Sequence, residues 1–112
     1  MPSDHDAKLS ITIETCDNHL RVSPVGEVDL ASSPELRRSL QQALANSEGM
    51  VVVDLSGVPY MDSSGVATLV EALQICRKQS RELILARPTN RVESIFTISK
   101  LDSVFTIQGD LP

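Results

Sequence analysis

A run of apolar residues at positions 50–55, Met-Val-Val-Val-Asp-Leu, limits the possible folds of this chain more than any other segment. Every position except Asp54 is apolar, whereas a strand with one face in water would alternate apolar and polar residues. A near-continuous apolar run is typical of a central strand that is covered on both faces. The turn-like Ser-Gly-Val-Pro at 56–59 ends the run. The rest of the chain must therefore form layers around a buried strand.

The segment after this turn combines a loop with the start of a helix. Asp62-Ser63-Ser64-Gly65 precedes a helical pattern that runs from Val66 through Gln79 without a helix breaker. Asp62 or Ser63 is the expected N-cap of this helix. Unpaired N–H groups and the positive end of the helix dipole favour an anion at such a position, including a covalently attached phosphate. A serine here therefore either caps the helix or is a site of covalent modification.

The same helical pattern predicts which side chains face the core. Spacing by three and four residues separates an apolar face from a polar one. The expected inward residues are Val66, Leu69, Val70, Leu73 and Cys76. The expected outward residues are Thr68, Glu71, Gln74 and Lys78.

Other segments predict the remaining elements of one α/β domain. The alternation at Leu9–Thr15 indicates a half-buried strand, and the turn Asp17-Asn18 leads into a second strand. In that second strand we expect Leu20, Val22 and Val25 to point inward, and Pro24 suggests an edge or a bulge. A helix starts at Ser32-Ser33-Pro34-Glu35 and ends at residues 46–49. A strand at residues 82–86 comes next, and a helix capped by Thr89 follows it. The last predicted strand covers residues 104–107.

The predicted order is β-β-α-β-α-β-α-β, with amphipathic helices and a mixed sheet of about four or five strands. We expect a single domain at residues 9–108, a polar N-terminal tail at 1–8 and a short C-terminal tail at 109–112.

Composition argues against several classes of function. The net charge is -5, and lysine and arginine are scattered along the chain, so we expect no direct binding of nucleic acid. No apolar stretch approaches the roughly 20 residues that span a bilayer. The polar, acidic start of the chain is not a secretory signal, and we expect a cytoplasmic protein without membrane insertion. Cys16 and Cys76 lack metal or redox spacing and are expected to be reduced thiols.

The sequence contains few of the residues that catalysis at these serines would need. A nucleophilic Ser64 would need a nearby base, but the chain has only His5 in the N-terminal tail and His19 at the first hairpin turn. Asp62 as a phosphate acceptor would need Mg²⁺ and a second carboxylate. Three carboxylates are available in principle for that role: Glu27, Asp29 and Asp54. We expect no enzyme, no cofactor and no metal site.

Several segments together resemble one family, the STAS domain, and specifically the bacterial anti-sigma factor antagonists. The resemblance lies in Val52-Val53-Asp54-Leu55 followed by Tyr60-Met61-Asp62-Ser63-Ser64-Gly65, and in Gly26-Glu27-Val28-Asp29 before the first helix. It continues in residues 91–96 and 101–105 and covers roughly Leu9 to Ile107 in register.

The resemblance implies a protein that switches partners. In the family the serine before the glycine is the phosphoacceptor, which corresponds to Ser64, with Ser63 as the alternative. The unphosphorylated protein binds an anti-sigma factor that is also a serine kinase, phosphorylation separates the two, and a serine phosphatase restores binding. The implied partner-binding residues are Glu27, Asp29, Asp62, Ser63, Gly65 and Thr68.

An alternative remains open from the resemblance. The same fold serves as a constitutive binding subunit in ABC-type lipid transport systems, although such subunits often lack a serine before the glycine. This chain also departs from many antagonists, which carry Leu-Gly after the glycine where Val66-Ala67 stands here. The sequence leaves the identity of the kinase, the sigma factor and the oligomeric state undetermined.

Overall fold

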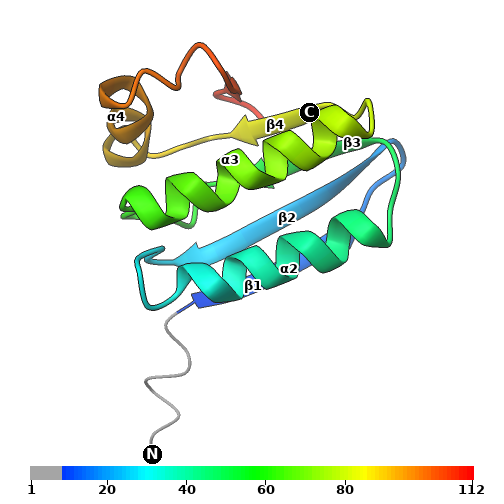
Figure 1. The fold of residues 1–112 in the computed structure, drawn as a ribbon, viewed down its shortest axis with the longest axis horizontal. Helices are drawn as coiled ribbons and strands as arrows, with labels where there is room; N and C mark the ends of the chain where they lie inside the picture. Colours follow the sequence, from blue (N-terminus) through cyan, green and yellow to red (C-terminus); the bar gives the residue numbers. More distant parts are fainter. Residues whose placement is uncertain (1–8) are drawn as a thin grey trace, which may run out of the picture.

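Five strands and three helices alternate along the chain in the predicted order (Figure 1). The computed structural model describes residues 9–112, so the predicted polar tail at 1–8 lies outside it. The elements are β1 (Leu9–Thr15), β2 (His19–Gly26), α2 (Ser33–Ala45), β3 (Met50–Asp54), α3 (Ser63–Lys78), β4 (Leu83–Ala86), α4 (Asn90–Ile98) and β5 (Thr106–Gln108). The α/β class and the mixed sheet are confirmed.

The strands form one sheet in the order β1-β2-β3-β4-β5. β1 and β2 are antiparallel because a tight turn joins them, and the other neighbouring pairs are parallel. Each parallel connection passes through a helix, as such crossovers require. The carboxyl ends of β2, β3 and β4 therefore lie at one edge of the sheet, and the loops that leave this edge build the candidate site.

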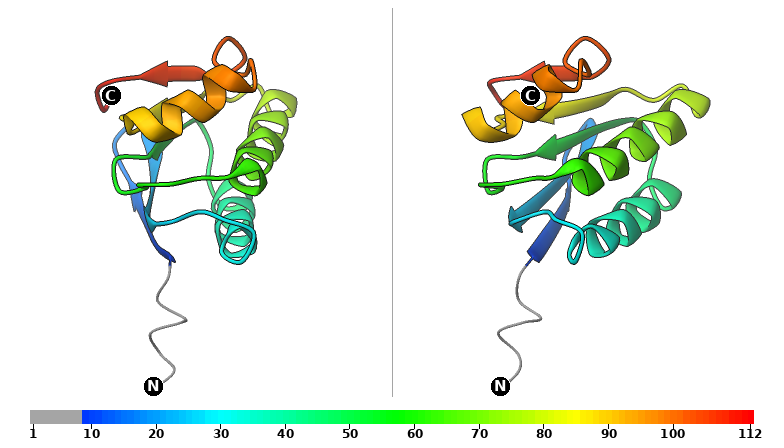
Figure 2. Two further views of the ribbon diagram at one scale, coloured as in Figure 1. Left: turned by 90° about the vertical axis from the view of Figure 1, so that its left-hand side faces the viewer. Right: turned by 60° about the vertical axis from the view of Figure 1, so that its left-hand side comes forward.

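All three helices pack on the same face of the sheet (Figure 2). Leu36 of α2, Leu69 of α3 and Phe96 of α4 are completely buried in one core with Val51 and Val53 of β3. Aliphatic residues dominate this core, and its aromatic pair, Phe96 and Phe105, meets edge to face with 5.3 Å between ring centroids.

The expected cover on both faces of β3 is confirmed, because Val51, Val52 and Val53 are all fully buried. Val52 points to the face without helices, yet it is also fully buried. It packs there with Ile84 and Ala86 of β4, and the half-buried Met50 and Leu111 lie against this small cluster. Neighbouring side chains and the end of the chain thus cover β3 on the face that carries no helix.

β2 corrects one of the predicted inward positions. Leu20, Val22 and Pro24 alternate along the strand, and all three are buried. Val25 points to the opposite face and is 55% exposed. β2 is an inner strand of the sheet, so the expectation of an edge is wrong. Its pairing with β3 covers only His19 to Val22, and Pro24 lies beyond that paired segment, where a missing N–H costs no ladder bond with β3.

The last strand begins later than predicted. The N–H groups of Val104 and Phe105 both donate to the carbonyl oxygen of Leu101, so these residues form a turn. β5 therefore spans Thr106–Gln108.

Arg81 connects the ends of three elements opposite the candidate site. Its guanidinium donates to the carbonyl oxygens of Leu44 (3.0 Å) and Gly49 (2.8 Å) and to the hydroxyl of Ser47 (2.8 Å). It also donates to the side-chain oxygen of Gln79 at 3.1 Å. One side chain thus satisfies acceptors at the end of α2 and before β3, a role that no local pattern in the sequence indicates.

Candidate functional site

The site is the start of α3, where Asp62 is the N-cap. The Asp62 backbone is extended, and its Oδ1 accepts hydrogen bonds from the backbone N–H of Ser64 at 2.9 Å and from the Ser64 hydroxyl at 2.5 Å. These bonds hold the pKa of Asp62 below its usual value, with the Ser64 hydroxyl as the largest cause. Of the two predicted caps, the structure selects Asp62.

The two serines of the motif have different surroundings. Ser63 is exposed, and within residues 9–112 its hydroxyl has no hydrogen-bond partner. Ser64 is half-buried, and its hydroxyl is held by Asp62. The site therefore combines a free hydroxyl with an oriented one on consecutive residues.

Gly65 allows a close approach between this helix and the neighbouring loop. A Cβ atom at position 65 would lie 2.6 Å from Met61 Cγ and 2.7 Å from Val28 Cγ1, closer than real Cβ contacts. Met61 and Val28 are both fully buried. The glycine of the motif is therefore required by packing.

Backbone hydrogen bonds join the two loops that the sequence singled out. Val28 and Met61 form a parallel bridge, in which the Val28 N–H donates to Tyr60 O (3.0 Å) and the Asp62 N–H donates to Val28 O (3.1 Å). This bridge continues the parallel pairing of the sheet past the ends of β2 and β3. The Glu27–Asp29 loop and the Asp62–Gly65 loop are thereby brought side by side.

The Glu27–Asp29 loop is fixed from within by Ser32. The Ser32 hydroxyl donates to the carbonyl oxygen of Glu27 at 2.8 Å and accepts from the Asp29 N–H at 3.0 Å. Asp29 Oδ1 in turn accepts from the N–H groups of Ala31 and Ser32, both at 3.0 Å. Ser32 holds the N-cap position of α2 as predicted, but its hydroxyl secures this loop and makes no cap bond to the helix. The Glu27 side chain remains exposed.

Thr68 differs from its expected placement on the exposed face of α3. It is only 7% exposed, and its hydroxyl donates to the Ser64 carbonyl oxygen at 3.0 Å. α3 packs beside α2, so the helix buries more of its circumference than the sheet alone would cover. Thr68 therefore supports the turn that carries Ser64.

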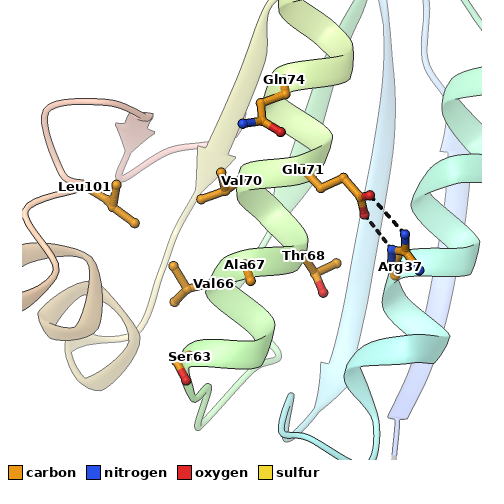
Figure 3. A pocket seen from close by; sticks show the side chains of 9 residues that line it. All are labelled: Arg37, Ser63, Val66, Ala67, Thr68, Val70, Glu71, Gln74 and Leu101. Atoms are coloured by element: carbon orange, nitrogen blue, oxygen red, sulfur yellow. Dashed lines mark hydrogen bonds and ion pairs between the residues drawn. The ribbon is translucent and has the colours of Figure 1, made fainter.

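A groove of about 560 Å³ runs along α3 from Ser63 (Figure 3). The side of the groove next to α2 carries the ion pair between Arg37 and Glu71, whose hydrogen bonds measure 2.6 and 3.1 Å. The opposite side is apolar and includes Val70 and Leu101. Arg37 and Leu101 were not predicted as part of this surface, because both lie far from the motif in the chain.

The structure also places the other residues that were considered for catalysis or metal binding. His19 is the first residue of β2 and pairs with the first residue of β3. It therefore lies at the amino ends of these strands, whereas Ser64 follows their carboxyl ends. Arg87 binds the Asp54 carboxylate through hydrogen bonds of 2.7 and 3.3 Å. Burial pushes the pKa of Asp54 upward, but the bonds from Arg87 and Ser56 outweigh it and lower the pKa. Among residues 9–112 no group of three or more His, Cys, Asp or Glu side chains is placed to hold a metal ion.

These features define an α/β domain with helices on one side of a mixed sheet and a serine at the start of a central helix. The STAS domain family model matches residues 10–111, and the chain belongs to this family. In the part of the chain described by the structure, no helix is long and apolar enough to cross a bilayer.

Known relatives agree with this assignment. The chain is 31% identical over 103 residues to the anti-sigma-B factor antagonist of Listeria monocytogenes, with 90% of each chain covered. A crystal structure of an anti-sigma factor antagonist from Mycobacterium paratuberculosis superposes with a TM-score of 0.85, at 23% identity over 92% of this chain and 87% of the other.

A third relative has been solved in two states. The anti-sigma factor antagonist SpoIIAA in its unphosphorylated form matches with a TM-score of 0.76, at 18% identity over 90% of this chain and 89% of the other. The phosphorylated form, described as a Bacillus cell fate determinant, matches with a TM-score of 0.70, at 17% identity over 90% of this chain and 92% of the other.

Proposed function

We propose that this protein is an anti-sigma factor antagonist that works without catalysis, by switching partners. In its unphosphorylated state it binds an anti-sigma factor that is also a serine kinase, and so frees the sigma factor. Phosphorylation of Ser64, with Ser63 as the alternative acceptor, releases the protein, and a serine phosphatase resets it. A need for ATP would place this cycle in the cytoplasm.

The observation that carries the proposal is the serine at the start of α3, next to Asp62, whose backbone N–H is hydrogen-bonded to Val28 of the neighbouring loop. An exposed Glu27 and the carboxylates of Asp29 and Asp62 belong to the same two loops. Because the two loops are hydrogen-bonded neighbours, a protein partner bound to one of them would also contact the other. The relatives described above support the assignment, because each is an anti-sigma factor antagonist and one is known in a phosphorylated form.

The physical effect of the modification would be electrostatic. A phosphate adds about -1.5 to -2 charge at neutral pH. It would join a surface that already carries the Asp62 carboxylate, on a chain with a net charge of -5. A partner that fits the unmodified surface would then meet a bulky dianion. Because phosphate is compatible with a helix N-terminus, we expect the fold to persist and far-UV circular dichroism to show no loss of helix.

The direct test is to incubate the protein with MgATP and each purified serine kinase of the anti-sigma type from the source cell, and to map phosphate by mass spectrometry. Ser64→Ala should stay bound to the kinase even in the presence of MgATP, and Ser64→Asp should bind weakly or not at all. No phosphate on either serine, together with equal affinity of the two variants, would contradict the proposal. Co-purification with a transport ATPase would instead support the transport-subunit alternative, which no relative described above favours.

A further inference from the structure

The two adjacent serines pose a question of selectivity. Ser63 is exposed with a free hydroxyl, whereas Ser64 is half-buried with its hydroxyl bound to Asp62. Accessibility alone would make Ser63 the better substrate for a kinase. Selective use of Ser64 therefore needs a second cause, and the Asp62 carboxylate is the only side chain within residues 9–112 that is hydrogen-bonded to the Ser64 hydroxyl.

Asp62 is itself held in place, which makes it able to orient its neighbour. Its backbone N–H is bound to the carbonyl oxygen of Val28 at 3.1 Å, and its carboxylate is bound to the Ser64 N–H at 2.9 Å. A hydroxyl has one hydrogen and two lone pairs, so donation of the hydrogen to Asp62 turns the lone pairs of Ser64 Oγ away from the carboxylate. The unbound Ser63 hydroxyl is free to occupy any of its staggered rotamers.

We propose that Asp62 is a positioning residue that directs phosphoryl transfer to Ser64 in preference to Ser63. This inference rests on the proposed function and adds to it the cause of the site selectivity. Holding a reacting atom in its productive orientation lowers the entropy that must be lost in the transition state. The kinase would thus meet a nucleophile that is already aligned at Ser64 and one that is unaligned at Ser63.

The chemical step follows from this arrangement. Ser64 Oγ forms a bond to the γ-phosphorus of the MgATP held by the kinase, and the bond from that phosphorus to the bridging oxygen of ADP breaks, leaving its electron pair on ADP. The hydroxyl proton is released to water as the new bond forms, and Asp62 acts only by holding Ser64 Oγ in place until then. In the product, Asp62 has lost the donated hydrogen and stands next to a phosphate dianion.

The test compares the wild type with Asp62→Gly and Asp62→Asn, using MgATP and the anti-sigma kinase that labels the wild type. Glycine is tolerated at an N-cap, so Asp62→Gly removes the acceptor of the Ser64 hydroxyl at little cost to the helix start. Asp62→Asn removes the charge but keeps an oxygen that accepts the same hydrogen bond. For Asp62→Gly we expect the rate of Ser64 labelling to fall on the order of tenfold or more, mainly in kcat, and the ratio of Ser64 to Ser63 in phosphopeptide maps to fall with it. Asp62→Asn should keep a ratio close to that of the wild type.

Asp17→Asn is the matched control, because Asp17 is exposed and lies in the β1–β2 turn, at the end of the sheet opposite the motif. It makes the same change in net charge and should keep the wild-type rate and ratio. Ser63→Ala should also be labelled at the wild-type rate, and Ser64→Ala should gain little label on Ser63. A wild-type ratio and rate in Asp62→Gly, or an equal loss in Asp62→Gly and Asp62→Asn, would overturn the inference while leaving the proposed function intact. Absence of label on both serines of the wild type would overturn the proposed function as well.

Discussion

Replacing Gly65 by alanine should destabilise the protein even though alanine is the better helix former. The added Cβ would lie 2.6 Å from Met61 Cγ and 2.7 Å from Val28 Cγ1. Neither neighbour can move easily, because both are fully buried and the backbone bridge between them fixes their positions. The substitution therefore presses on the contact that holds the two loops of the site together.

The expected magnitude follows from two opposing effects. Overpacking a tight interior typically costs about 1–3 kcal/mol, whereas alanine in place of glycine gains up to about 1 kcal/mol within a helix. Gly65 stands in the first turn of α3, where that gain is smaller, so the free energy of unfolding should fall by about 1–2 kcal/mol. For a domain of this size each kcal/mol lowers Tm by roughly 3–6 °C.

Urea unfolding followed by circular dichroism measures this change directly. Gly109→Ala is the matched control, because no atom lies within 4 Å of a Cβ at that position. Its free energy of unfolding should stay within about 0.5 kcal/mol of the wild type. If Gly65→Ala unfolds at the same urea concentration as Gly109→Ala or at a higher one, the close approach does not require glycine and the packing explanation is refuted.

Two further predictions concern residues outside the motif. Arg81→Ala should lower the free energy of unfolding by about 1–3 kcal/mol in urea titrations, since the Ser47 hydroxyl and two carbonyl oxygens lose a charged donor. Arg77→Ala, which removes one long hydrogen bond of 3.3 Å, should cost clearly less, and equal losses would contradict the role of Arg81. In the folded protein the pKa of Asp54 lies below its usual value of 3.8. The ion pair between Asp54 and Arg87 therefore stabilises the fold above pH 3.8. This stabilisation is lost as the pH falls through the lower pKa of the folded state. Asp54→Asn should therefore show a smaller fall in Tm than the wild type between about pH 6 and about pH 3, and parallel curves would contradict this.

Much of the architecture could be predicted because its signals are local. The apolar run before Leu55, the Pro34 at the start of α2 and the Thr89 cap of α4 each specify an element through a few neighbouring residues. The error at Thr68 arose because packing between distant segments decides its exposure, whereas the error at Val25 was a local one of strand alternation. Thr68 was expected on the outer face of α3, and only the neighbouring α2 explains its burial.

The sequence by itself determined that a serine pair stands at the start of a helix, because caps, turns and apolar periods are read from adjacent residues. The tertiary structure alone decided that Asp62 holds Ser64 and leaves Ser63 free, and that the Val28 loop lies beside them. The physical reason is that the Val28–Met61 bridge joins residues far apart in the chain, and its hydrogen bonds exist only once β2 and β3 are parallel neighbours.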